Sequence, residues 1–360
     1  MENNNSKKDK FKAFALLAAT KGLEYGKLFA AKELYSSFFK RYEKKPLYKI
    51  YGEFDYSRVK DRLKRKLFSF NTDTAELQGY FYPCENCKGM VIVCHGMHAG
   101  ADDYLPFIMY FVKNGYSVFT YDCKGTYLSS GDSTVGMGTP LVDLDYAIRF
   151  IKSSREFSKY PLFIFGHSWG GYAACSVLSI HKNIKAVAAI APFNDAYTLI
   201  EDKGVQFTGP FADSLITGFP KDFLETYQKH LFKDYTKYTA VKGINSTDIP
   251  VLIAHGNRDF TISFSGQSVI SHKKEIRRNN VYYLVTSNEQ AGHETILHSL
   301  EAIKYQKKIK KLFDDLKDKN EDDLTEKQLT AFCNKINHAL YSEVNEELMS
   351  KVVKLFDSTL

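Results

Sequence analysis

The stretch Pro161–Gly171 reads PLFIFGHSWGG and decides the fold class. Its apolar run, Leu162–Phe165, is typical of a strand buried on both faces. The Ala-rich residues 172–180 that follow have the apolar spacing of a helix. Between them lies a G-x-S-x-G centred on Ser168, which is typical of a sharp strand-to-helix turn that exposes a serine hydroxyl at the end of a sheet. The glycines two positions to either side fit this turn, because its backbone leaves no room for larger side chains.

Short apolar runs alternate with helical patterns on both sides of this stretch. The predicted strands are residues 90–94, 116–121, 186–191, 251–254 and 281–285, and predicted helices include 104–112 and 141–151. Strands that alternate with helices of this length indicate a parallel, doubly wound α/β sheet. A hairpin-like pair, residues 67–70 and 77–82, precedes the repeat. We therefore predict an α/β fold with a mostly parallel sheet.

One interval, between Pro192 and Pro250, lacks the strand–helix repeat and is rich in aromatic residues. A connection of this length in a compact domain is usually a functional insertion, so we predict a helical lid over the carboxyl ends of the strands. The predicted organisation is an N-terminal helical extension (1–65), the first part of the core (66–193), the lid (194–248), the second part of the core (249–317) and a C-terminal helical extension (318–360).

The two extensions have amphipathic patterns. Residues 11–42 fit a helix docked on the main domain, a basic helix on a membrane surface, or a signal peptide. The longest uncharged apolar run, residues 13–19, is too short to span a bilayer, and no small-x-small cleavage site follows it before Lys21. Of the three readings we favour docking. At the other end, Thr325 and Gln328 form a capping box, and two apolar stripes predict two helices packed on the domain. The charge run 60–66 is predicted to be a solvated face.

Composition excludes several classes of function. The 360 residues have a net charge of +7 spread over many lysines and contain no nucleic-acid-binding signature, so we predict no nucleic-acid partner. The six cysteines lack the spacing of a disulfide framework, which favours a reducing cytoplasm. The C-x-x-C at Cys84 has no second pair, and no third ligand is spaced to join His95 and His98. We therefore predict no metal and no cofactor.

A serine nucleophile needs a base, and the base needs an orienting acid. In a sheet of this type the acid and the histidine follow the serine in that order, each on a loop after a strand. Asp259 follows the predicted strand 251–254, and His293 follows the predicted strand 281–285. We predict that Ser168 is the nucleophile, Asp259 the acid and His293 the base.

Other candidates for these roles are weaker. Asp234 and Glu201, both in the predicted lid, are alternative acids. His298 lies one turn further along a predicted helix and is expected at the surface. His167 is held in the turn before Ser168, so we expect it to pack rather than to act as a base.

An oxyanion needs two backbone N–H groups that point to the developing negative charge. The residue after the nucleophile, Trp169, supplies one. The loop after the predicted strand 90–94 supplies the other, and Met97 is the predicted donor because Gly96 lets the backbone approach closely.

Together these motifs resemble the α/β-hydrolases, most closely the serine aminopeptidase and monoacylglycerol lipase-like group. The resemblance covers about residues 66–317 and is carried by His95-Gly96, Tyr121–Gly125 with Ser129–Gly131, Gly166–Gly171, His255–Asp259 and Gly292-His293. The D-x-R-G-x-G-x-S-x-G segment of the group is only partly kept. Lys124 replaces the usual Arg, and Thr126, Tyr127 and Leu128 precede the serines.

The resemblance implies a serine hydrolase that cleaves carboxylic esters through an acyl-enzyme, as a carboxylesterase or monoacylglycerol lipase-like enzyme, without a cofactor. The aromatic lid favours a small-molecule ester with an apolar or aromatic acyl group. One alternative is an aminopeptidase of the proline iminopeptidase kind, which needs a carboxylate in the lid for the substrate's amino group; the available ones are Glu201, Asp202, Asp213 and Glu225. The other is a non-catalytic binding protein. We expect a cytoplasmic protein, with contact to a membrane surface through the N-terminal helix as an open alternative.

Overall fold

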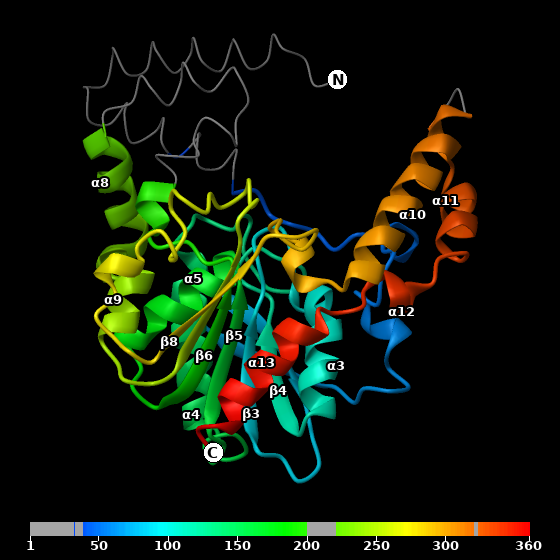
Figure 1. The fold of residues 1–360 in the computed structure, drawn as a ribbon. Coiled ribbons are helices and arrows are strands. Elements are labelled where there is room, and N and C mark those ends of the chain that lie inside the picture. The colour runs from blue at the N-terminus through cyan, green and yellow to red at the C-terminus, as the bar shows by residue number, and fades with distance from the viewer. Residues whose placement is uncertain (1–31, 33–38, 200–220, 320–322) are drawn as a thin grey trace.

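The computed structural model describes residues 32, 39–199, 221–319 and 323–360, and these form a mixed sheet of eight strands with helices on both faces (Figure 1). The strands are β1 (Lys66–Asn71), β2 (Glu76–Tyr82), β3 (Gly89–Cys94), β4 (Tyr116–Tyr121), β5 (Leu162–His167), β6 (Ile184–Ile190), β7 (Val251–Gly256) and β8 (Val281–Thr286). Their order in the sheet is β1-β2-β4-β3-β5-β6-β7-β8. β2 pairs antiparallel with β1 and with β4, and the other neighbours are parallel. The predicted α/β fold is confirmed.

Helices of the described part cover both faces of this sheet. The α-helices are α3 (Leu105–Lys113), α4 (Thr139–Ser153), α5 (Trp169–Ser176), α8 (Lys221–Phe232), α9 (Ala240–Asn245), α10 (Leu300–Asp318), α11 (Glu326–Cys333), α12 (His338–Tyr341) and α13 (Glu346–Asp357). The 3₁₀-helices are η1 (Leu47–Lys49), η2 (Tyr56–Arg58), η3 (Ala101–Tyr104), η4 (Val177–Ser179), η5 (Lys233–Lys237), η6 (Lys273–Glu275) and η7 (Thr295–Leu297).

Two hydrophobic clusters form the core, one on each face of the sheet. Apolar residues of α4, α5 and α9 pack on one face, and apolar residues of α3 and α13 pack on the other. Every residue of β3, β4, β5 and β7 is buried, as expected for strands covered on both sides. The strand-to-helix turn at Ser168, here called the elbow, therefore leaves a buried strand in the interior of the sheet.

The C-terminal extension divides between the core and a projecting arm. α13 crosses the sheet in front of the strands (Figure 1), and its Phe356 ring lies 4.9 Å from the Phe163 ring of β5. α10 and α11 project together from the body on the right of the view (Figure 1). The predicted capping box of Thr325 and Gln328 begins α11. The first apolar stripe, Leu329, Phe332, Ile336 and Leu340, was predicted as a single helix. It is instead divided between α11 and the short helix α12, with Ile336 between them.

The sequence also predicted features that lie wholly or partly outside the described residues. Most of the amphipathic segment 11–42 and residues 200–220 of the predicted lid belong to this group. The later part of the lid contains α8 and α9, whereas residues 39–42 form bridges to the loop after β4 and no helix. The predicted domain boundaries stay a prediction. No helix among the described residues has the length and apolar composition needed to cross a bilayer.

Candidate active site

The G-x-S-x-G forms the sharp turn that the sequence predicted. β5 ends at His167, α5 begins at Trp169, and Ser168 between them has φ 54° and ψ −114°. A positive φ strains any residue with a side chain, and such strain is found at functional positions. A Cβ at Gly170 would lie 2.2 Å from the carbonyl oxygen of Cys94, and one at Gly166 would lie 2.3 Å from that of Gly170. Both positions therefore require glycine.

Ser168, His293 and Asp259 form one hydrogen-bonded chain. His293 Nε2 lies 2.8 Å from Ser168 Oγ, and His293 Nδ1 lies 2.7 Å from Asp259 Oδ2. A carboxylate can only accept, so Nδ1 carries the ring proton and Nε2 is left as the acceptor for the serine hydroxyl. The loops after β7 and β8 thus bring the predicted acid and base to the end of β5.

Asp259 is held as a carboxylate by its surroundings. Its Oδ1 accepts the N–H groups of Thr261 and Ile262, both at 2.8 Å, and its Oδ2 also lies 3.1 Å from His255 Nε2. Burial acts to raise the pKa of Asp259, but the hydrogen bonds from His255 and His293 and from the backbone outweigh it and hold the pKa well below its usual range. The acid is therefore ionised at neutral pH and fixed in position from four directions.

Two backbone N–H groups border the cavity beside Ser168. Met97 and Trp169 both line it, and neither N–H has an acceptor in the part of the chain that the structure describes. The N–H of Trp169 is at the N-terminus of α5, where helix geometry leaves donors free and favours negative charge. These are the two donors that the sequence selected for an oxyanion.

Comparison with known proteins finds similar sequences and similar folds. Residues 85–219 match the serine aminopeptidase S33 family. The chain is 28% identical over 108 residues to the monoglyceride lipase of Saccharomyces cerevisiae, a match that covers 28% of this chain and 34% of the yeast protein. The esterase Pf2001 of Pyrococcus furiosus has a TM-score of 0.53 at 18% identity, over 86% of this chain and 98% of that chain. Another crystal form of Pf2001 has a TM-score of 0.51 at 19% identity, over 74% of this chain and 95% of that chain.

The chain has the α/β-hydrolase fold. The resemblance drawn from the motifs is therefore confirmed for the fold, and residues 85–219 carry the match to the family. The match to the yeast lipase spans about a third of that protein's length, and the likeness to the esterase is one of fold.

The site also has a buried hydrogen-bond network that the sequence did not reveal. His167 Nε2–H donates to the carbonyl of His293 at 3.1 Å, so its Nδ1 must accept, and the Tyr104 hydroxyl donates to it at 2.8 Å. The oxygen of Tyr104 in turn accepts the N–H of Gly96 at 2.9 Å. Burial lowers the pKa of His167 to about 4, so the ring is neutral. The network joins the elbow, the loop of Met97 and the loop of His293.

The cavity above Ser168 has a volume of about 480 Å³ and an uneven lining. Its apolar side chains include Met137, Trp169, Phe193, Leu199 and Ile262. Its polar ones include Tyr42, Lys45, Asp103, Glu294, His298, Gln306 and Tyr341. Tyr42 and Lys45 come from the N-terminal extension and Tyr341 from the C-terminal one, so both extensions form part of the wall. His298 was predicted at the surface, which is wrong, because it follows the short helix η7 and lines the cavity.

The alternative residues named from the sequence lie elsewhere. Asp234 has a side chain that is 89% exposed and pairs with Lys237 at 3.5 Å. Glu201 lies outside the described residues. His95 is buried and its Nε2 accepts the N–H of Cys123 at 2.9 Å, so it supports the loop.

One group of metal-binding residue types occurs at the site. Ring nitrogens of His167 and His293 and a carboxylate oxygen of Glu294 lie within 4.8 Å of one another. Both nitrogens of each ring already have hydrogen-bond partners, which are Tyr104 and the His293 carbonyl for His167, and Ser168 and Asp259 for His293. An ion would have to displace these bonds, so the residues do not fit a resident metal.

Proposed function

We propose that this protein is a serine hydrolase that cleaves carboxylic esters through an acyl-enzyme. The observation that carries the proposal is the continuous chain from Asp259 through His293 to Ser168, with the ring nitrogen next to the serine free to accept a proton. The family match and the free N–H groups of Met97 and Trp169 support the same reading.

Acylation begins when His293 Nε2 takes the proton of Ser168 as its Oγ attacks the ester carbonyl carbon. The carbonyl oxygen becomes an oxyanion and accepts hydrogen bonds from the N–H groups of Met97 and Trp169, each worth roughly 10²–10³-fold in rate in comparable sites. The intermediate collapses, the ester C–O bond breaks, and the imidazolium gives its proton to the departing alkoxide. Asp259 stays ionised throughout and stabilises the imidazolium.

Deacylation repeats the sequence with water. His293 removes a proton from a water molecule, which attacks the acyl carbon and forms a second oxyanion in the same position. The intermediate releases the carboxylic acid as Ser168 takes back its proton from the ring. The reaction needs no cofactor.

The mixed cavity lining supports a small ester that has both an apolar acyl group and a polar alcohol group. The apolar side chains lie around the elbow and the start of the lid, and they would receive the acyl chain. The polar side chains, among them Glu294 directly after His293, would contact the alcohol group of the ester. The similarity to a yeast monoglyceride lipase supports the same class of substrate.

One observation favours a second candidate, an aminopeptidase. Glu294 follows His293 directly and lines the cavity, and no cation pairs with it in the described ranges. Such a carboxylate could hold the amino group of a peptide substrate. The lid carboxylates that the sequence offered for this role lie outside the described side chains.

The test is hydrolysis of p-nitrophenyl esters from acetate to palmitate, beside proline p-nitroanilide, by the wild type and by Ser168→Ala. We expect ester turnover that is lost in the variant, with a chain-length optimum set by the apolar part of the cavity. Cleavage of the anilide with little ester turnover would replace the proposal by the aminopeptidase. No turnover of any of them by folded wild type would favour a binding protein.

A further inference from the structure

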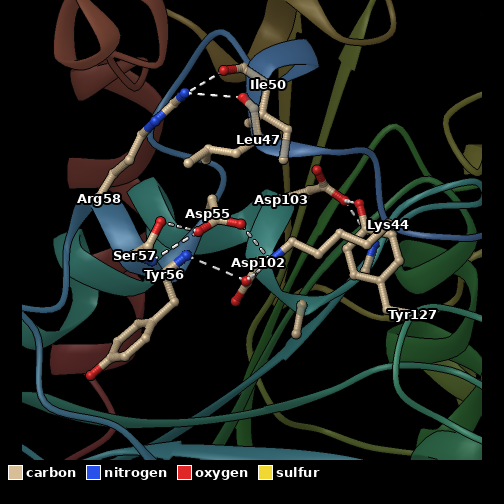
Figure 2. Close-up of polar contacts among 12 residues, drawn as sticks. Lys44, Leu47, Ile50, Asp55, Tyr56, Ser57, Arg58, Asp102, Asp103 and Tyr127 are labelled. Atoms are coloured by element: carbon tan, nitrogen blue, oxygen red, sulfur yellow. Dashed lines mark hydrogen bonds and ion pairs between the residues drawn. The ribbon is translucent and has the colours of Figure 1, made fainter. Parts of the chain in front are cut away.

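The N-terminal segment 39–58, here called the strap, lies against the loop that carries Met97 (Figure 2). The strap precedes the region matched by the family, which begins at residue 85. The loop, residues 96–104, runs from the end of β3 to α3 and is here called the oxyanion loop. Its contacts with the strap are ionic and largely buried.

The main contact is an ion-pair cluster around Asp102. Lys44 pairs with Asp102 and, at 2.7 Å, with Asp55 of the strap. Arg65 pairs with the other oxygen of Asp102 at 2.8 Å, and the N–H of Tyr56 donates to Asp102 at 3.3 Å. Asp102 is only 5% exposed, so removal of a partner would leave a buried charge without compensation. Figure 2 shows Lys44 between Asp55 and Asp102. With Arg65 the cluster contains two positive and two negative groups and is balanced.

A second contact joins the strap to the oxyanion loop through Tyr127. The Tyr127 hydroxyl donates to Asp103 at 2.5 Å (Figure 2). Asp103 also accepts the N–H of Gly100 at 2.8 Å. The Tyr127 ring stacks on that of Tyr42, with centroids 6.0 Å apart and planes 17° apart. The backbones pair as well, since the N–H of Tyr127 donates to the Tyr42 carbonyl at 3.0 Å.

Arg41 of the strap holds the loop in which this chain departs from the family pattern. Its guanidinium donates to the carbonyls of Tyr127, Ser129 and Gly131, the last two at 2.8 and 2.9 Å. In that loop Lys124 stands where the family has Arg. The strap therefore supplies an arginine to the loop from outside the family match.

The oxyanion loop needs such support at Met97. Residues 95–100 form no helix or strand, and His98 has a positive φ of 60°, a strained value for a residue with a side chain. The N–H of Met97 has no acceptor among the described residues, so no bond of its own fixes its direction. Its direction depends on the attachments before and after it, at Gly96 and at Asp102.

We propose that Lys44 and Asp102 are positioning residues that hold the N–H of Met97 in line with the oxyanion. Through Lys44, the strap thereby helps to position a group of the active site. This inference rests on the proposed function, because an oxyanion arises only if Ser168 attacks an acyl carbon.

The test compares Lys44→Met with Lys49→Met, which removes an exposed lysine from the same segment. Lys49 has no ion pair in the described part of the chain, so its variant should behave as wild type. We expect Lys44→Met to lower kcat for p-nitrophenyl butyrate by about 10- to 100-fold with KM unchanged, because a displacement near 1 Å costs about that much. Rates are normalised to the fraction of protein that a fluorophosphonate labels. Lys44→Arg, which keeps the charge, should restore most of the rate.

A transition-state analogue separates positioning from a general loss of structure. An alkyl trifluoromethyl ketone forms a hemiketal with Ser168 whose oxyanion occupies the same position, so its Ki should rise by the factor by which kcat/KM falls. A merely structural role would lower the labelled fraction and leave kcat per labelled site and the Ki unchanged, and that result would overturn the proposal. If Lys44→Met does not fold, the double variant Lys44→Met/Asp55→Asn is tested in its place, because it leaves one positive and one negative group in the cluster.

Hydrogen exchange tests the inference without turnover. Amides 96–104 should exchange faster in Lys44→Met than in the wild type or Lys49→Met, and equal exchange would contradict the proposal. A folded wild type that neither hydrolyses esters nor reacts with the fluorophosphonate would instead refute the proposed function. The two failures are therefore distinguishable.

Discussion

Replacement of Asp259 by Asn tests the role of the acid, because the structure dictates how the new amide must lie. Oδ1 of Asp259 accepts two backbone N–H groups, those of Thr261 and Ile262, at 2.8 Å each. A backbone N–H cannot become an acceptor, so the amide oxygen must occupy this position. The amide NH₂ group must then occupy the position of Oδ2 and face the ring of His293.

This orientation reverses the hydrogen bond to His293. Nδ1, which lies 2.7 Å from Oδ2, must accept a hydrogen bond in place of donating one, and the ring proton moves to Nε2. A protonated Nε2 cannot take the proton of Ser168. We expect kcat to fall roughly 10⁴-fold, as tautomer reversal does in Ser-His-Asp hydrolases. That loss corresponds to about 5.4 kcal/mol of activation free energy.

The assay is kcat for p-nitrophenyl butyrate, with circular dichroism to show that the variant is folded. Asp234→Asn is the matched control, because the sequence left Asp234 open as the acid and the structure exposes it. We expect the control to match wild type. A loss of less than about tenfold in Asp259→Asn, or an equal loss in the control, would refute the reasoning.

Three further variants test the rest of the account. Gly170→Ala should abolish soluble expression, since its Cβ would lie 2.2 Å from the Cys94 carbonyl oxygen; normal thermal melting would contradict this. Burial raises the pKa of Asp143 to about 7. Between about pH 4 and pH 7 the folded state therefore keeps a proton that the unfolded chain has lost, so the free energy of unfolding should decrease as the pH rises through this range. Urea titrations at pH 5 and 8 should show that Asp143→Asn loses this decrease, whereas an unchanged slope would exclude it. Tyr104→Phe removes the donor to His167 and should lower kcat by about tenfold with little change in KM, and a change confined to KM would argue against a positioning role.

The elbow could be predicted from the sequence because local chemistry determines it. An apolar run, a serine between two glycines and an Ala-rich segment allow one backbone path, and the structure has it around Ser168. Asp259 and His293 could be selected by their order, because parallel strands bring their carboxyl ends to one edge of a sheet. The structure places both side chains within hydrogen-bonding distance of their neighbours in the chain of three.

The position of His298 could not be predicted from periodicity. The sequence pattern placed His298 one turn along a predicted helix, which would have turned its side chain to the surface. The helix instead begins at Leu300, where the Ser299 hydroxyl caps it by accepting the N–H of Ala302 at 3.0 Å. The sequence contained this capping signal, but the hydrophobic pattern concealed it.

Contacts between segments that are distant in the chain also could not be predicted from the sequence. Lys44 and Asp102 are 58 residues apart, and no spacing rule joins them. The charge run 60–66 was predicted as a solvated face, which is wrong for Arg65. Its guanidinium lies over the rings of Tyr56 and Tyr80, at 3.7 and 4.9 Å from the ring centres, and pairs with Asp102. Charge patterns predict exposure by default and do not identify the few groups that find a buried partner.

The central claim is that Ser168 is the nucleophile of an acyl-enzyme, and covalent labelling tests it most directly. The folded wild type is treated with a fluorophosphonate, digested, and examined by mass spectrometry. The account predicts one adduct per chain, on the peptide that contains Ser168, and none in Ser168→Ala or after prior inhibition by a trifluoromethyl ketone. An adduct on another residue, or no adduct on the folded wild type, would contradict it.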